Sequence, residues 1–321
     1  MTEHPPRGNS RPVGGHDDAR RAALRPQKPS AARIWLLAAR PRTLPAAIAP
    51  VLVGTALAAS EDVLKVPSFV AALLGALFIQ IGTNLSNDYS DARRGADTED
   101  RLGPVRVTAG GLVPPRQVLR ATWVAFALAV LAGSYLIATT GWELLVVGAA
   151  SILAGFLYTG GPRPYGYAGF GEIFVFVFFG LVAVAGSYFA QTERLTVDAL
   201  LLAVPVGLLA SAILVVNNVR DLETDRRAGK QTLAVRLGRE NTRRLYTAMI
   251  TAAYLTAALP WLLGELEPWV LICWLTIRLA IPMVRIVRTR TDGPALNQAL
   301  AGTGSLQLVF CMTLSLGVLA V

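Results

Sequence analysis

The chain has 321 residues, of which 53% are hydrophobic and only 16% are charged, and its net charge is +9. This balance is typical of a polytopic membrane protein and argues against two soluble domains. Both histidines, His4 and His16, lie near the N-terminus, which excludes a histidine metal site or histidine catalysis in the apolar body. The two cysteines, Cys273 and Cys311, lie in separate apolar runs, so the sequence has no Cys-x-x-Cys metal site.

Residues 1–30 are rich in Pro, Gly and Arg and lack apolar periodicity, so we predict that they form a disordered cytoplasmic tail. Residues 31–321 are predicted to form one all-α, polytopic transmembrane domain. Most of its nine apolar segments reach the ~20 residues that cross a bilayer as a helix, although the fourth is short. Three prolines in the first segment, at positions 41, 45 and 50, predict a kinked helix. The segments are residues 34–59, 67–89, 117–138, 142–158, 171–191, 196–218, 244–263, 268–288 and 297–320.

The Lys and Arg residues predict the orientation of these segments in the membrane. If the tail is cytoplasmic, only Lys65 and Arg194 among the 30 Lys and Arg residues fall in external loops. We therefore predict a plasma-membrane protein whose N-terminus is cytoplasmic and whose C-terminus is external. The same asymmetry accounts for the basic net charge without a nucleic-acid partner.

Two matched motifs end the second and sixth segments on the predicted cytoplasmic side. Each has an Asn four residues before an Asp and a second Asp within one further turn, so an amide and two carboxylates share a helix face. Oxygen ligands of this kind hold Mg²⁺ that bridges to a phosphate. The offset of 133 residues suggests two four-helix repeats plus a ninth helix, with a site between the halves. The motif residues are Asn84, Asp88 and Asp91, and then Asn217, Asp221 and Asp225.

The loops that follow the two motifs mix basic residues with glycines. Lys and Arg contact phosphate oxygens, and glycine lets the backbone approach them. The candidate diphosphate-binding residues are Arg93, Arg106 and Lys230, with Arg236 as a further candidate, and Asp97 is a further candidate metal ligand. The alternative interpretation is that these cations only maintain the membrane topology.

The loop after the fourth segment, residues 158–171, combines tyrosines with glycines and prolines. Its functional interpretation is a wall for a planar aromatic acceptor, built by Tyr158 and Tyr165, with Arg163 near the acceptor's acidic group. The alternative is an aromatic belt at the membrane interface. Phenylalanines on the fifth segment either line a groove for an apolar tail or face lipid; they are Phe174, Phe176, Phe178 and Phe179.

At these motifs the chain resembles the UbiA superfamily of intramembrane aromatic prenyltransferases, and most closely its branch that uses 1,4-dihydroxy-2-naphthoate. The resemblance extends from about residue 31 to the C-terminus, and its most specific part is the second motif with the Ala-Gly-Lys that ends at Lys230. It implies nine helices around a central cavity open to the cytoplasmic side and to lipid, Mg²⁺ as cofactor, and a polyprenyl diphosphate donor. Where the broader family has a third Asp in its first motif, this chain has Gly95. The motifs are residues 82–91, 95–98, 103–108, 110–112, 160–167, 217–225 and 228–238.

The reaction that the resemblance implies is transfer of a polyprenyl group to 1,4-dihydroxy-2-naphthoate with loss of CO₂ and diphosphate, giving demethylmenaquinol. The catalytic acids would be Asp88, Asp91, Asp221 and Asp225. Alternatives are a sister prenyltransferase that uses 4-hydroxybenzoate or homogentisate, a cation-coupled transporter, and a transferase that acts on nucleotide-linked lipids. Transporter sites usually lie near the midplane of the membrane, whereas these acids lie at helix ends. The sequence also lacks the Asp-Gly-x-x-Ala-Arg pattern that is typical of the class acting on nucleotide-linked lipids.

Overall fold

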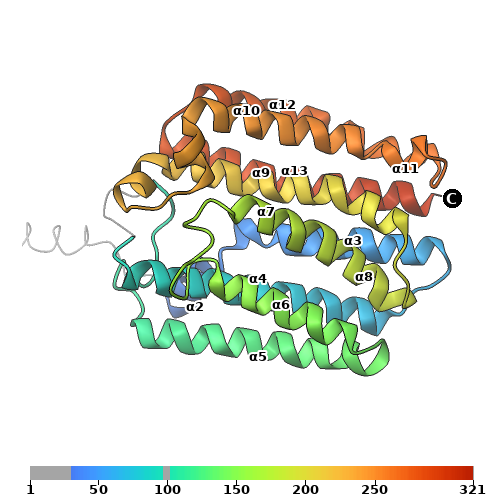
Figure 1. Ribbon diagram of the computed structural model, residues 1–321, viewed down its shortest axis with the longest axis horizontal. Coiled ribbons are helices and arrows are strands. Elements are labelled where there is room, and N and C mark those ends of the chain that lie inside the picture. The colour runs from blue at the N-terminus through green and yellow to red at the C-terminus, as the bar shows by residue number, and fades with distance from the viewer. Residues whose placement is uncertain (1–29, 97–101, 321) are drawn as a thin grey trace, which may run out of the picture.

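The computed structural model describes residues 30–96 and 102–320, and within these two ranges every regular element is helical. The predicted tail lies outside the described residues except for Ser30, and so does Asp97. The helices run roughly along one direction (Figure 1), with α10 and α12 along one edge of the bundle and α5 along the other. The predicted all-α class is therefore confirmed.

The first apolar segment is broken, as its prolines predict. It comprises α2 (Ala31–Ala39), the 3₁₀ turn η1 (Pro41–Thr43) and α3 (Pro45–Ser60), and the two halves meet at an angle of 52°. The break lies at Arg40, whose backbone is left-handed with φ of 54°. Pro41 cannot donate a helical hydrogen bond, so the helix cannot continue through this point. The break directs the turn at Thr43 toward α4.

The next three helices form the face of the bundle that carries the first motif. They are α4 (Val66–Arg93), α5 (Pro115–Thr139) and α6 (Glu143–Leu157). Since α4 is 28 residues long, it extends past the apolar segment and carries the whole first acidic motif as helix. The predicted short fourth segment is the 15-residue α6.

The fifth span is interrupted by a π-helical turn. It consists of α7 (Gly171–Phe176), the π-helix η2 (Val177–Val182) and α8 (Ala183–Thr192). Gly180 in this turn packs directly on Gly207, because a Cβ built at Gly180 would lie 2.6 Å from the Gly207 Cα. Such small residues let two helix backbones approach closely in a membrane.

The remaining helices enclose the buried core. They are α9 (Val197–Arg227), α10 (Leu233–Thr256), α11 (Leu259–Leu262), η3 (Pro268–Thr276), α12 (Ile277–Thr289) and α13 (Gly293–Leu319). The central helix is α9, because 72% of its apolar stretch is buried inside the protein. The main apolar cluster joins α9 to α3, α8, α10 and α13. Both α4 and α9 end at the same end of the bundle, which brings the two acidic motifs together (Figure 1).

The described helices confirm a multi-pass membrane protein but not the predicted number of spans. Seven are long and apolar enough to cross a membrane, and the bent pair of α2 and α3 makes an eighth. The helix α6 is apolar but shorter than a full span. The predicted count of nine and the two four-helix repeats therefore stay predictions.

Candidate active site

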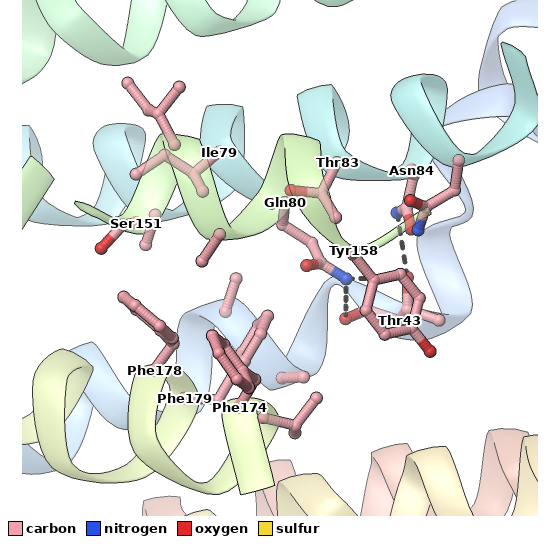
Figure 2. Close-up of a pocket in the computed structure, with 18 of the residues that line it drawn as sticks. Thr43, Ile79, Gln80, Thr83, Asn84, Ser151, Tyr158, Phe174, Phe178 and Phe179 are labelled. Atoms are coloured by element: carbon pink, nitrogen blue, oxygen red, sulfur yellow. Dashed lines mark hydrogen bonds between the residues drawn. The ribbon is translucent and has the colours of Figure 1, made fainter. Parts of the chain in front are cut away.

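One cavity of about 450 Å³ connects the two acidic motifs with an apolar interior. Its polar end lies where α4 and α9 end, beside the loops that follow them. Its apolar part runs between α4, α5, α6 and the fifth span. In Figure 2, Phe174, Phe178 and Phe179 lie on one side of this part and Ile79 on the other. The cavity can therefore hold a molecule with an anionic head and an apolar tail.

The carboxylate of Asp91 lies in the cavity wall and contacts three side chains. It is 2% exposed. Its Oδ2 lies 3.1 Å from the Arg106 guanidinium, and its Oδ1 accepts a 2.6 Å hydrogen bond from the Tyr167 hydroxyl. Lys230 Nζ lies 3.5 Å from the same Oδ1. A buried carboxylate is costly unless it is paired, so these partners fix Asp91 in the cavity wall.

Lys230 links the two motifs. Its ammonium lies 3.5 Å from Asp91, 3.8 Å from Asp225 Oδ1 and 4.7 Å from the centre of the Tyr167 ring. The loop turns back at Gly229, whose φ of 73° favours glycine, and Lys230 N–H then donates to the Asp225 carbonyl. The sequence predicted Lys230 as a phosphate contact, and the structure places it in the cavity lining together with Arg106.

Asp221 is held by a residue that the sequence analysis did not select. The buried guanidinium of Arg220 donates hydrogen bonds to both carboxylate oxygens of Asp221, at 2.8 Å and 2.6 Å. The same guanidinium donates to Asn217 Oδ1 and to Asn297 Oδ1. The position of Arg220 inside the second motif is the signal in the sequence that it could be buried with the acids.

The structure gives Asp88 a different environment from Asp91. Its two oxygens accept hydrogen bonds from the backbone N–H groups of Val107 and Thr108, at 3.0 Å and 2.9 Å, and it is not part of the cavity lining. Asn87 lines the cavity instead and accepts a 2.8 Å hydrogen bond from the Thr159 hydroxyl. The sequence analysis missed Asn87, although it precedes Asp91 by the same four residues that separate Asn217 from Asp221.

Asn84, another predicted ligand, lines the cavity and is tied to the break in the first span. Its Nδ2 donates to the Ala39 carbonyl at 3.0 Å and to Thr43 Oγ1 at 3.1 Å. Gln80, one turn earlier, also donates to Thr43 Oγ1, at 3.3 Å, as Figure 2 shows. These hydrogen bonds hold the left-handed turn at Arg40 against α4.

Two of the three predicted acceptor-binding residues lie at the cavity. Tyr158 and Tyr165 line it, with ring centres 5.4 Å apart, and Tyr165 stacks on Phe174 at 3.9 Å. Arg163 is exposed and does not line the cavity. Arg93 also stays outside it, with its guanidinium against Tyr89.

The oxygen atoms at the polar end fit a magnesium site that substrate phosphates complete. Carboxylates and side-chain amides are the ligands that Mg²⁺ takes, usually one or two carboxylates together with phosphate oxygens. Asp91, Asp221 and Asp225 line the cavity, as do Asn87 and Asn217. Within the described ranges no three His, Cys, Asp or Glu side chains form a ready-made metal cluster. The carboxylate and amide oxygens that line the cavity are the kind that hold Mg²⁺ together with phosphate oxygens.

Comparison with known proteins agrees with this geometry. The pattern of the UbiA prenyltransferase family matches residues 47–314. A 1,4-dihydroxy-2-naphthoate octaprenyltransferase of Mycobacterium tuberculosis is 44% identical over 281 residues, which are 88% of this chain and 95% of the relative. One from Escherichia coli is 38% identical over 283 residues, which are 86% of this chain and 92% of the relative.

Solved structures share the fold at much lower sequence identity. A UbiA homolog from Archaeoglobus fulgidus bound to GPP and Mg²⁺ matches 90% of this chain and 100% of its own, with a TM-score of 0.67 at 19% identity. The family resemblance that the motifs predicted is thus confirmed over most of the chain, and the chain belongs to the UbiA prenyltransferase family.

Proposed function

We propose that this protein transfers a polyprenyl group from polyprenyl diphosphate to 1,4-dihydroxy-2-naphthoate, with loss of diphosphate and CO₂. The observation that carries the proposal is that a single cavity joins paired acids and cations at one end to an apolar interior at the other. The relatives described as 1,4-dihydroxy-2-naphthoate octaprenyltransferases support the choice of acceptor. The product would be demethylmenaquinol, which oxidises to the quinone.

The polar end would bind the diphosphate. Lys230 is a buried cation and Arg106 a partly buried one, both in the cavity wall, and each already contacts Asp91. When a diphosphate enters, their charge-assisted hydrogen bonds can shift to its oxygens. Asp91 and Asp225 would then hold Mg²⁺, together with Asp221 and the amide oxygens of Asn87 and Asn217. Bound Mg²⁺ would supply positive charge that stabilises the leaving diphosphate.

The apolar part of the cavity would hold the prenyl chain and exclude water from the reacting carbon. Phe174, Phe178 and Phe179 would contact the chain. The allylic C–O bond breaks with its electron pair on the diphosphate, and the carboxylate-bearing ring carbon then forms the new C–C bond to the allylic carbon. The carboxylate leaves as CO₂, and the electron pair of its C–C bond restores the aromatic ring. A water-poor site protects such a carbocation-like centre from hydrolysis. Tyr158 and Tyr165 would form the wall against which the planar acceptor lies.

We also propose that the enzyme lies in the plasma membrane with its acidic motifs at the cytoplasmic face. Of the 30 Lys and Arg residues, only two fall in the loops that this orientation makes external. Cytoplasmic loops carry the excess of Lys and Arg in membrane proteins. The two water-soluble reaction partners, the naphthoate and the released diphosphate, would then exchange with the cytoplasm.

The test is turnover by the purified full-length protein with Mg²⁺, a polyprenyl diphosphate and three separate acceptors. These are 1,4-dihydroxy-2-naphthoate, 4-hydroxybenzoate and homogentisate, and the products are identified by mass. We expect a decarboxylated prenyl naphthalenediol and release of diphosphate, with Asp91→Asn as the inactive control. If the enzyme prenylates only 4-hydroxybenzoate or only homogentisate, it has the activity of a sister prenyltransferase. Cation-driven uptake into vesicles without diphosphate release would favour the transporter alternative.

A further inference from the structure

A buried carboxylate lies just outside the residues that line the cavity. Glu172, in the first turn of α7, is 4% exposed and does not line the cavity. Its Oε1 accepts a 2.8 Å hydrogen bond from Asn218 Nδ2, and its carbonyl accepts one from the Ser211 hydroxyl at 3.0 Å. Its Oε2 has no hydrogen-bond partner among the described residues. Asn218 is therefore the one described side chain that pairs with this carboxylate.

Asn218 is the part of the pair that reaches the cavity. It lies on α9, is 5% exposed and belongs to the cavity lining. The amide of Asn218 has one donor arm and one acceptor arm, and the structure directs its NH₂ arm to the Glu172 carboxylate. The oxygen arm, Oδ1, is then the one left for a ligand in the cavity. Without Glu172 the amide could turn over and present either arm.

The pair lies beside the aromatic wall. Glu172 follows Gly171, and a Cβ built at Gly171 would lie 3.3 Å from the Tyr158 ring and 3.5 Å from its hydroxyl. A ligand placed against Tyr158 is thus within the region that Asn218 lines. The diphosphate presents oxygen atoms that accept hydrogen bonds. The Asn218 Oδ1 is also an acceptor, so it cannot form a hydrogen bond with them. The hydroxyls of the aromatic acceptor, in contrast, are hydrogen-bond donors.

We propose that Glu172 is a positioning residue that holds Asn218 so that its Oδ1 accepts a hydrogen bond from a ring hydroxyl of the acceptor. This inference rests on the proposed function, since it assumes a hydroxylated aromatic acceptor. As the ring attacks, it gains positive charge and its hydroxyl becomes a stronger donor. The hydrogen bond is then stronger in the transition state than in the ground state, so it contributes to kcat as well as to acceptor binding.

The first experiment compares acceptors in the full-length enzyme. Affinity is measured by competitive inhibition for 1,4-dihydroxy-2-naphthoate and for two analogues, each of which lacks one of its two hydroxyls. The wild type should lose roughly three- to tenfold in affinity for one analogue, the usual effect of one neutral hydrogen bond. In Asn218→Leu, which removes the acceptor atom, that difference should disappear. The donor KM should stay unchanged in this variant.

The second experiment tests the pair itself. Asn218→Asp sets two carboxylates against each other and should lower kcat and acceptor affinity. Adding Glu172→Gln returns a donor–acceptor pair with the roles exchanged, because the Gln NH₂ can donate to the Asp while the second Asp oxygen faces the cavity. The double variant should recover the discrimination between acceptors that the single variant loses. Ser211→Ala, which removes only the contact to the Glu172 backbone, is the matched control and should keep that discrimination.

The outcomes separate this inference from the proposed function. If the wild type turns over no hydroxylated aromatic acid, the proposed function fails. If it does, but Asn218→Leu discriminates between the analogues as the wild type does, the role of the pair fails. A raised Mg²⁺ requirement in Asn218→Leu would make Asn218 a metal ligand instead and would also overturn the inference. If Asn218→Leu does not fold, the double variant decides, and a double variant no better than Asn218→Asp contradicts the pairing.

Discussion

Replacing Lys230 with methionine isolates the charge that bridges the two acidic motifs. Methionine keeps most of the apolar stem and removes the ammonium that lies 3.5 Å from Asp91 and 3.8 Å from Asp225. Asp91 keeps its contacts with Arg106 and Tyr167. The substitution therefore removes the proposed phosphate contact without opening the cavity wall.

The expected size of the effect follows from the burial of the ammonium. Lys230 is only 8% exposed, so its interactions are weakly screened by solvent. Losing one hydrogen bond to a charged group costs about 1.5–3 kcal/mol, or roughly ten- to a hundredfold in affinity. We expect Lys230→Met to raise the KM for polyprenyl diphosphate by this factor and to leave the acceptor KM within about twofold. Lys230→Arg should recover part of the loss.

The assay is steady-state kinetics with each substrate varied in turn, together with direct binding of a non-hydrolysable donor analogue. Direct binding is needed because KM equals a dissociation constant only when chemistry is slow relative to dissociation. Arg226→Met is the matched control, since Arg226 is an exposed cation near the same loop that pairs with Glu223. A donor KM that changes no more in Lys230→Met than in this control would refute the reasoning.

Three further predictions concern orientation, the acceptor and the prenyl chain. Single cysteines at Gly95 and Arg239, in a background without Cys273 and Cys311, should react only from the cytoplasm, and those at Ser60 and Arg194 only from outside; external labelling at Gly95 would reverse the orientation. Arg163→Ala should leave the acceptor KM within about twofold, because Arg163 lies outside the cavity lining, and a tenfold rise would return it to the acceptor site. Gly148→Phe should lower turnover of octaprenyl diphosphate far more than that of geranyl diphosphate, because Gly148 lines the apolar part with open space at its Cβ position; equal losses for both donors would count against that path for the chain.

The helical segments and the place of the site could be predicted from the sequence because both depend on local patterns. Apolar runs fix where helices form in a membrane, and the matched spacing of Asn and Asp marks the ends of α4 and α9 as a site. The kink at Arg40 followed from the prolines around it. The π-helical turn at Val177–Val182 had no such signal, because its sequence is as apolar as that of the neighbouring turns.

The roles of individual polar residues were harder to predict, since they depend on which loop folds back onto which helix. Asp88 and Asp91 have the same chemistry and nearly the same helix face. The backbone of the loop at Val107 reaches only Asp88. Arg163 and Lys230 are both loop cations, but the loop that turns at Gly229 brings only Lys230 inside. The spacing of residues along a helix shows which side chains share a face of that helix. It does not show which loop packs against them.

The contrast between Asp88 and Asp91 can be tested directly. Asp88→Asn would turn an NH₂ group toward one of two buried backbone N–H donors, and a buried donor left unsatisfied costs about 1–3 kcal/mol. We therefore expect a lower melting temperature and a loosened loop at Val107, with an unchanged Mg²⁺ requirement in the protein that stays folded. Asp91→Asn removes the charge that Arg106 and Lys230 both contact, so it should also melt lower than the wild type. Unlike Asp88→Asn, its folded protein should lose nearly all turnover, with only partial recovery in excess Mg²⁺. If Asp88→Asn instead melts normally and needs more Mg²⁺, Asp88 is a metal ligand and the loop contact is secondary.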